Sequence, residues 1–201
     1  MTVQERLDKA SGIYNEAAVL ISSMGEYVRV RADIVWDTKT MLGEFDLILQ
    51  AILMHIALSN GRVDPAEKEF IARISQRADI LSYLRARTGN RINLSWNDFS
   101  RMDKDSAGQL MEHIDRLLRE NVCDAFVRPL AVGDFIDSDR DELGMLEKMI
   151  SRLAALLTSA DEYDPDSLHL AYAKSVAELL GERWKYYKEN PNADAPPFTI
   201  S

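Results

Sequence analysis

The chain has 201 residues, of which 46% are hydrophobic and 28% are charged, and its formal net charge is -9. This composition is typical of a globular protein of one domain and excludes an intrinsically disordered chain. The negative charge opposes binding to nucleic acid and to anionic membrane surfaces. The only cysteine, Cys123, allows no internal disulfide, and the N-terminal residues lack the pattern of a signal peptide, so we expect a cytoplasmic protein.

Residues 1–41 are predicted to form a helical arm. Apolar or small side chains recur there with heptad spacing, at Val3, Leu7, Ala10, Tyr14, Ala17, Ile21, Met24 and Val28. Such a seam either pairs with a second copy as a coiled coil or lies along the protein's own bundle. Alanine and tyrosine within the seam favour the second alternative, because coiled-coil seams prefer leucine and isoleucine. Ser22, Ser23 and Gly25 predict a weaker helix near its end, and Gly43 is expected to mark the entry to the next helix.

The stretch 45–58 reads FDLILQAILMHIAL and is apolar around most of a helix's circumference. Only Asp46, Gln50 and His55 interrupt it. A helix of this kind is buried either in a bundle or in a membrane. A bilayer span needs about 20 apolar residues. This stretch is shorter, so we predict the central core helix of a bundle and no membrane insertion.

An acidic turn follows the core helix. Asp64 is placed to cap the next helix, Pro65 suits its first position, and Glu67 completes a capping box. Basic and aromatic side chains alternate between residues 68 and 101, a pattern also found in nucleic-acid interfaces. Intervening acids and the negative net charge favour a solvated helix face instead, so we expect no nucleic-acid binding.

The second half of the chain repeats this order. A helix through Phe126 is expected to kink or end at Pro129. A second acidic turn follows, then a long amphipathic helix that begins near Glu142, and a further helix capped by Asp164. Residues 190–201 are expected to form a loose tail.

The two halves align when Val63-Asp64 is laid over Ile136-Asp137. Neither half can bury its own apolar face, so we expect them to pack about a pseudo-twofold axis. The predicted fold is an all-α, compact bundle of about seven to nine helices with two pseudo-symmetric halves.

The two turns resemble the TerB-like family, bacterial all-helical domains associated with tellurite resistance and stress response. The residues that carry the resemblance are His55-Ile56-Ala57, Gly61, Val63-Asp64, Glu67, Gly133-Asp134, Ile136-Asp137 and Glu142. The resemblance covers about residues 42–157. We predict a TerB-like domain with an internal repeat over residues 42–189, and we expect the arm to pack on it. The resemblance also implies that acidic residues of the turns bind a divalent cation.

The carboxylates of both turns converge if the axis brings the turns together. These candidate metal ligands are Asp64, Glu67, Asp134, Asp137 and Glu142. Clustered carboxylates bind hard cations such as Ca²⁺ or Mg²⁺. Alternatively, Asp64 and Asp137 cap helices, and the other acids lie at helix N-termini, where the helix dipole favours negative charge. An EF-hand beginning at Asp137 is excluded, because Glu142 stands where the loop needs glycine.

The sequence contains no glycine-rich phosphate loop, nucleophile elbow or zinc motif, and we find no catalytic set. We therefore expect a non-enzymatic module of the stress response that binds a protein partner or a divalent cation through the acidic turns. The alternative function is a structural homodimer or scaffold that uses the N-terminal heptad helix.

Overall fold

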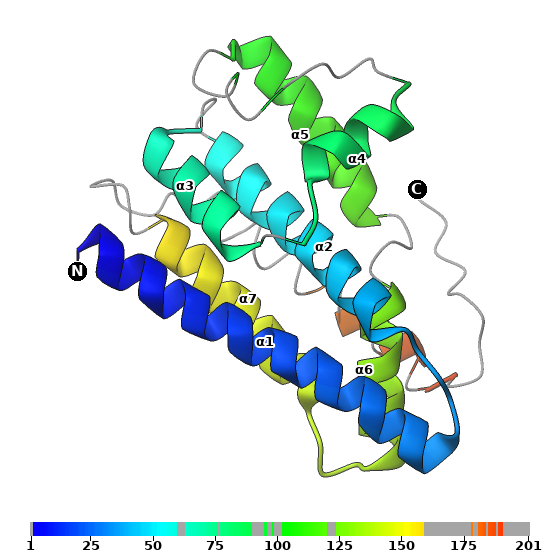
Figure 1. The fold of residues 1–201 in the computed structure, drawn as a ribbon. Coiled ribbons are helices and arrows are strands. Elements are labelled where there is room, and N and C mark those ends of the chain that lie inside the picture. The colour runs from blue at the N-terminus through cyan, green and yellow to red at the C-terminus, as the bar shows by residue number, and fades with distance from the viewer. Residues whose placement is uncertain are drawn as a thin grey trace.

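The computed structural model describes residues 2–59, 63–75, 77–89, 95, 98, 102–119, 124–158, 178, 181–183, 185–187, 189 and 190. Seven helices and no strand occur among these residues (Figure 1). They are α1 (Val3–Ala32), α2 (Thr38–Leu58), α3 (Pro65–Ile74), α4 (Ile80–Arg87), α5 (Lys104–Arg119), α6 (Asp124–Ile136) and α7 (Glu142–Thr158). The prediction of a compact all-α bundle is confirmed. Gly61, Cys123, Asp164 and the tail beyond residue 190 lie outside the described residues.

Helix α2 is the centre of the bundle, and it packs against each of the other six helices (Figure 1). Every residue from Phe45 to Leu58 is buried. By length and composition α2 could cross a membrane, but 83% of its most apolar stretch is buried inside the bundle. The predicted core helix is confirmed. The evidence for the core position is the burial of α2. Its length is not evidence, because 21 residues are enough to span a bilayer.

Helix α2 begins earlier than predicted. The carboxylate of Asp37 caps it by accepting hydrogen bonds from the backbone N–H groups of Lys39 (3.3 Å) and Thr40 (3.0 Å). Gly43 therefore lies inside the helix, and the predicted boundary after residue 41 falls within α2. A cap contributes about 1 kcal/mol, which offsets the similar cost of one glycine in a helix interior.

Helix α1 belongs to the same hydrophobic core. From Leu7 to Val28 its heptad seam is buried, and α1 packs most extensively against α6 and α7. The seam thus lies along the protein's own bundle, the alternative that the sequence favoured. Ser22 and Ser23 lie inside α1, and their hydroxyl groups donate to the backbone carbonyls of Ala18 (2.8 Å) and Leu20 (3.0 Å).

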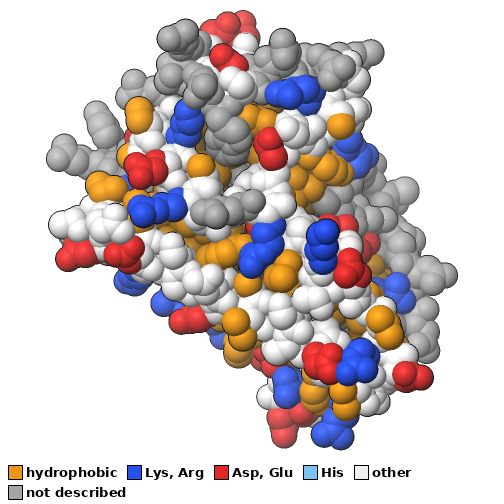
Figure 2. Space-filling model, viewed as in Figure 1, with side chains coloured by type: hydrophobic (Ala, Val, Ile, Leu, Met, Phe, Trp, Pro, Cys, Tyr) orange, Lys and Arg blue, Asp and Glu red, His pale blue; other side chains and the backbone are white. Residues whose placement is uncertain are grey.

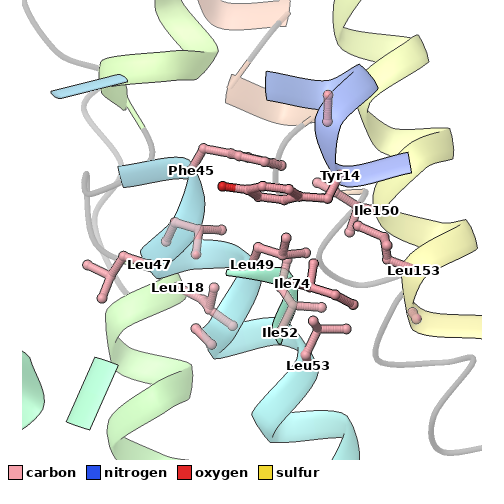
Figure 3. Close-up of a cluster of buried hydrophobic side chains, with 14 of the residues drawn as sticks. Tyr14, Phe45, Leu47, Leu49, Ile52, Leu53, Ile74, Leu118, Ile150 and Leu153 are labelled. Atoms are coloured by element: carbon pink, nitrogen blue, oxygen red, sulfur yellow. The ribbon is translucent and has the colours of Figure 1, made fainter. Parts of the chain in front are cut away.

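Aromatic rings join α1, α2 and α6 in the core. Tyr14 and Phe45 stack with ring centroids 6.2 Å apart (Figure 3). Phe45 also meets Phe126 edge-on at 5.7 Å. Leu49, Ile52 and Leu53 continue the cluster along α2 (Figure 3).

Asp46 is a fully buried polar residue that links three parts of the fold. Its carboxylate accepts hydrogen bonds from the Tyr14 hydroxyl (2.7 Å) and from the backbone N–H of Arg77 (2.8 Å). Burial raises the pKa of Asp46, and these two hydrogen bonds oppose that effect. Asp46 thereby attaches the connection between α3 and α4 to α1 and α2.

Gln50, one turn after Asp46, holds the same connection. Its side-chain amide donates to the backbone carbonyls of Ser75 (2.7 Å) and Ala78 (2.8 Å), and its oxygen accepts from the N–H of Ile80 (2.9 Å). Asp46 and Gln50, two of the polar interruptions in the apolar stretch, therefore anchor the connection between α3 and α4. His55, the third interruption, lies 3.1 Å from the Asp115 carboxylate of α5.

Pro129 was predicted to kink or end its helix. It does not end the helix, because α6 continues to Ile136. Pro129 is buried together with Phe126, Val127 and Leu130. Apolar burial of this kind contributes about 1.5–3 kcal/mol for each large side chain, which offsets the hydrogen bond that proline removes.

Two described residues near the C-terminus are fully buried, Arg183 and Tyr187. The Arg183 guanidinium binds the Asp124 carboxylate (2.6 Å) and donates to the carbonyl of Arg119 (3.2 Å). This part of the chain is thereby attached where α5 ends and α6 begins.

Candidate functional site

The first acidic turn has the predicted capping box. The Asp64 carboxylate accepts from the N–H groups of Ala66 (2.8 Å) and Glu67 (3.0 Å). The Glu67 carboxylate accepts in return from the N–H of Asp64 (2.9 Å), and Glu67 is buried. Both carboxylates thus have structural partners at the start of α3.

The second acidic turn is built differently. Asp134 lies in the last turn of α6, is fully buried, and accepts from the N–H groups of Glu142 (3.0 Å) and Leu143 (3.5 Å). A side chain of the preceding helix therefore supplies the acceptors for the start of α7. In the first turn, Asp64 supplies the acceptors for the start of α3 from the position directly before that helix.

The prediction that Asp137 caps the following helix is wrong. Asp137 accepts from the N–H of Asp139 (3.3 Å) and from Nε of Arg140 (3.3 Å), both within the turn. Asp64 directly precedes the first residue of α3, Pro65, whereas four residues separate Asp137 from the start of α7. Asp137 therefore lies too far from the first residue of α7, Glu142, to bond to its backbone.

Arg140 is the central residue of the second turn. Its guanidinium binds the carboxylates of Asp137 (3.3 Å) and Glu142 (2.9 Å). It also lies 4.2 Å from the ring centroid of Tyr27 on α1, within the range of a cation–π interaction. A guanidinium thus lies between two of the carboxylates that were predicted to hold a metal ion.

The five predicted ligands do not converge. The C-terminal end of α2 and the start of α3 lie at one end of the bundle, and the connection between α6 and α7 lies at the other (Figure 1). Asp64 and Glu67 therefore form one group, and Asp134, Asp137 and Glu142 form a second. Across the part of the chain that the structure describes, no three His, Cys, Asp or Glu residues are grouped so as to hold a metal ion.

The Gly133-Asp134 pair of the second turn has a structural explanation. A Cβ atom at position 133 would lie 2.0 Å from the Met24 sulfur, so glycine allows α1 to approach α6 closely. Asp134 caps α7 at the same point. The two residues that resemble the family motif thus join α1, α6 and α7.

Large apolar side chains are exposed around the second turn. The exposed fractions are 53% for Phe135, 37% for Ile136 and 42% for Met145. Asp139 and Asp141 are also exposed there. We name these five residues the second-turn surface.

The sequence analysis did not single out Phe135, although the helical period would have revealed it. Phe135 follows the buried Phe126 by nine residues, which at about 100° per residue places it on the opposite side of α6.

We expect Asp134→Ala to lower the free energy of unfolding by about 2 kcal/mol, because two backbone N–H groups lose their acceptor. Asp137→Ala, at a more exposed position, should cost about 0.5 kcal/mol or less. Urea denaturation of both variants measures this difference. An equal or larger loss for Asp137→Ala would reverse the assigned roles.

Comparisons of the chain with protein-family models, with curated proteins and with solved structures find no match in any of the three.

Proposed function

We propose that the chain is a non-enzymatic binding module that docks a basic, amphipathic segment of a protein partner on the second-turn surface. The observation that supports this is the exposure of Phe135, Ile136 and Met145 beside exposed acidic residues. Aromatic residues and methionine are enriched in protein interfaces, and aromatic residues often carry a large share of the binding energy.

The turn beneath this surface is held in one shape. Besides its contacts with two carboxylates and Tyr27, Arg140 donates its backbone N–H to the carbonyl of Asp137 (3.0 Å). The N–H of Asp137 bonds in turn to the carbonyl of Gly133 (3.1 Å). A surface that is already ordered loses less conformational entropy when a partner binds.

Charge favours a basic partner. Within the described residues, the carboxylate of Asp139 has no hydrogen bond or ion pair, and Asp141 is exposed two residues later. The whole chain carries a formal charge of -9, which attracts positively charged segments. Apolar side chains on the partner would cover Phe135 and Met145.

The proposed place in a bacterial stress response depends on the TerB-like resemblance alone. We do not extend the proposal to a dimer through the heptad seam, because that seam is buried against α6 and α7 from Leu7 to Val28. We also do not extend it to a cation held by both turns, because the turns lie at opposite ends of the bundle (Figure 1).

Selection of random peptides on the immobilised full chain tests the proposal. We expect the selected peptides to combine lysine or arginine with large apolar residues. In fluorescence anisotropy, Phe135→Ser should weaken their binding at least about tenfold. It should leave the free energy of unfolding within about 0.5 kcal/mol of the wild-type value, since Phe135 is exposed.

Val3→Ser is the matched control, because Val3 is 54% exposed and lies at the N-terminal end of α1, away from the second turn (Figure 1). Peptides that bind Phe135→Ser as tightly as the wild type, or selected peptides without basic residues, would contradict the proposal.

A further inference from the structure

A cleft between α4 and α5 is lined in part by basic side chains. Helices α4 and α5 lie at the end of the bundle away from the connection between α6 and α7 (Figure 1). Its volume is about 180 Å³, and it is lined by Leu84, Arg87, Thr88, His113, Arg116 and Leu117. The lining residues of each helix follow the spacing i, i+3, i+4, which places them on one helix face. Pockets for drug-sized ligands measure about 300–1,000 Å³. This cleft therefore suits one small chemical group.

Two side chains of the cleft, those of Arg116 and His113, are open to a ligand. Arg116 and His113 have no hydrogen bond or ion pair within the described part of the chain. Arg87 is fixed beside them, because its guanidinium donates to the Tyr83 hydroxyl (2.8 Å) and lies 5.8 Å from that ring's centroid. Figure 2 shows basic side chains on the face over α4 and α5.

The floor of the cleft is apolar, since Leu84 and Leu117 are each 2% exposed. Apolar surroundings lower the local dielectric constant and strengthen the attraction between a guanidinium and an anion. Guanidinium groups also bind phosphate and carboxylate oxygens through two parallel hydrogen bonds.

Basic residues near a helix C-terminus also offset the negative end of the helix dipole. Arg85 and Arg119 have this position in α4 and α5 without lining the cleft. Arg87 and Arg116 instead face one hollow together with His113. Dipole compensation alone does not require that arrangement.

We propose that the cleft binds the phosphate group of a small molecule. Arg116 supplies guanidinium N–H donors, His113 supplies an imidazole N–H, and Arg87 adds positive charge beside them. The cleft shares no residue with the second-turn surface. An experiment can therefore contradict one proposal and leave the other standing.

Thermal unfolding of the full chain in inorganic phosphate, compared with sodium chloride at equal ionic strength, tests this proposal. At a phosphate concentration about ten times the dissociation constant, we expect the Tm to rise by about 3 °C. Isothermal titration with phosphate should give one site per chain. Glycerol phosphate in a parallel titration identifies the source: tighter binding than phosphate indicates a phosphorylated small molecule, and weaker binding indicates free phosphate.

Arg116→Gln should weaken phosphate binding about tenfold, because one charge-assisted hydrogen-bond donor is lost. His113→Gln is a second variant at the same site and should weaken it to a smaller extent. Arg152→Gln is the matched control, because Arg152 is an exposed arginine of α7 that does not line the cleft. The proposal is wrong if phosphate has no effect beyond that of sodium chloride, or if Arg152→Gln loses as much affinity as Arg116→Gln.

Discussion

Replacing Asp46 with alanine is expected to lower the free energy of unfolding by about 3 kcal/mol. The Tyr14 hydroxyl and the Arg77 backbone N–H both donate to the Asp46 carboxylate, which is fully buried. Each donor left without an acceptor costs about 1–3 kcal/mol. Urea denaturation followed by circular dichroism measures the change.

Two further variants identify the cause of this loss. Asp46→Asn keeps an oxygen acceptor of similar shape, so we expect it to be less damaging than Asp46→Ala. Asp139→Ala removes an exposed carboxylate and should stay within about 0.5 kcal/mol of the wild type. If Asp46→Ala lies within about 1 kcal/mol of the wild type, the buried carboxylate does not hold the connection between α3 and α4.

Stability is expected to fall between pH 4.5 and 7 because of Glu44. Burial raises the pKa of Glu44 from 4.5 to about 7, opposed by a hydrogen bond from the Ala125 N–H and reinforced by Asp124. The folded chain therefore keeps this proton over a range in which the unfolded chain has lost it. When the folded state binds more protons, the free energy of unfolding decreases as the pH rises.

Glu44→Gln should remove this dependence. Glutamine can accept the same hydrogen bond from Ala125, which is 3.2 Å long in the wild type. The difference in pKa corresponds to at most about 3 kcal/mol, which partial exposure reduces to about 2 kcal/mol. The variant should match the wild type near pH 4.5 and exceed its stability by about 2 kcal/mol at pH 8.

Urea denaturation at four pH values between 4.5 and 8 measures the difference between variant and wild type. Glu112→Gln, at an exposed position of α5, is the control for loss of a negative charge. A constant difference between Glu44→Gln and the wild type at all pH values would show that Glu44 does not cause the dependence.

Hydrophobic periodicity was sufficient to predict the all-α bundle and its central helix. The run from Phe45 to Leu58 is apolar on nearly every side, and a helix bundle buries such a helix at its centre. Local chemistry was also sufficient for the Asp64 cap, because its carboxylate, Pro65 and Glu67 act within a single turn.

Contacts between residues that are distant in the chain could not be predicted from the sequence. Asp134 bonds to the backbone of residues eight and nine positions later, and no local motif records that contact. The same limitation applies to Arg140, whose contact with Tyr27 depends on how α1 packs. The two turns look alike in sequence, yet they differ in capping residue and in position. The resemblance between the halves therefore did not reveal where the carboxylates would lie.

The position of α1 has a consequence for the protein's synthesis. Its apolar side needs α6 and α7, yet about 125 residues separate the end of α1 from the end of α7. At about 5–20 residues per second, a ribosome takes roughly 6 to 25 s to make that interval. Throughout that time the side of α1 that faces α6 and α7 stays uncovered in the nascent chain, which is an opportunity for a chaperone and a hazard for aggregation.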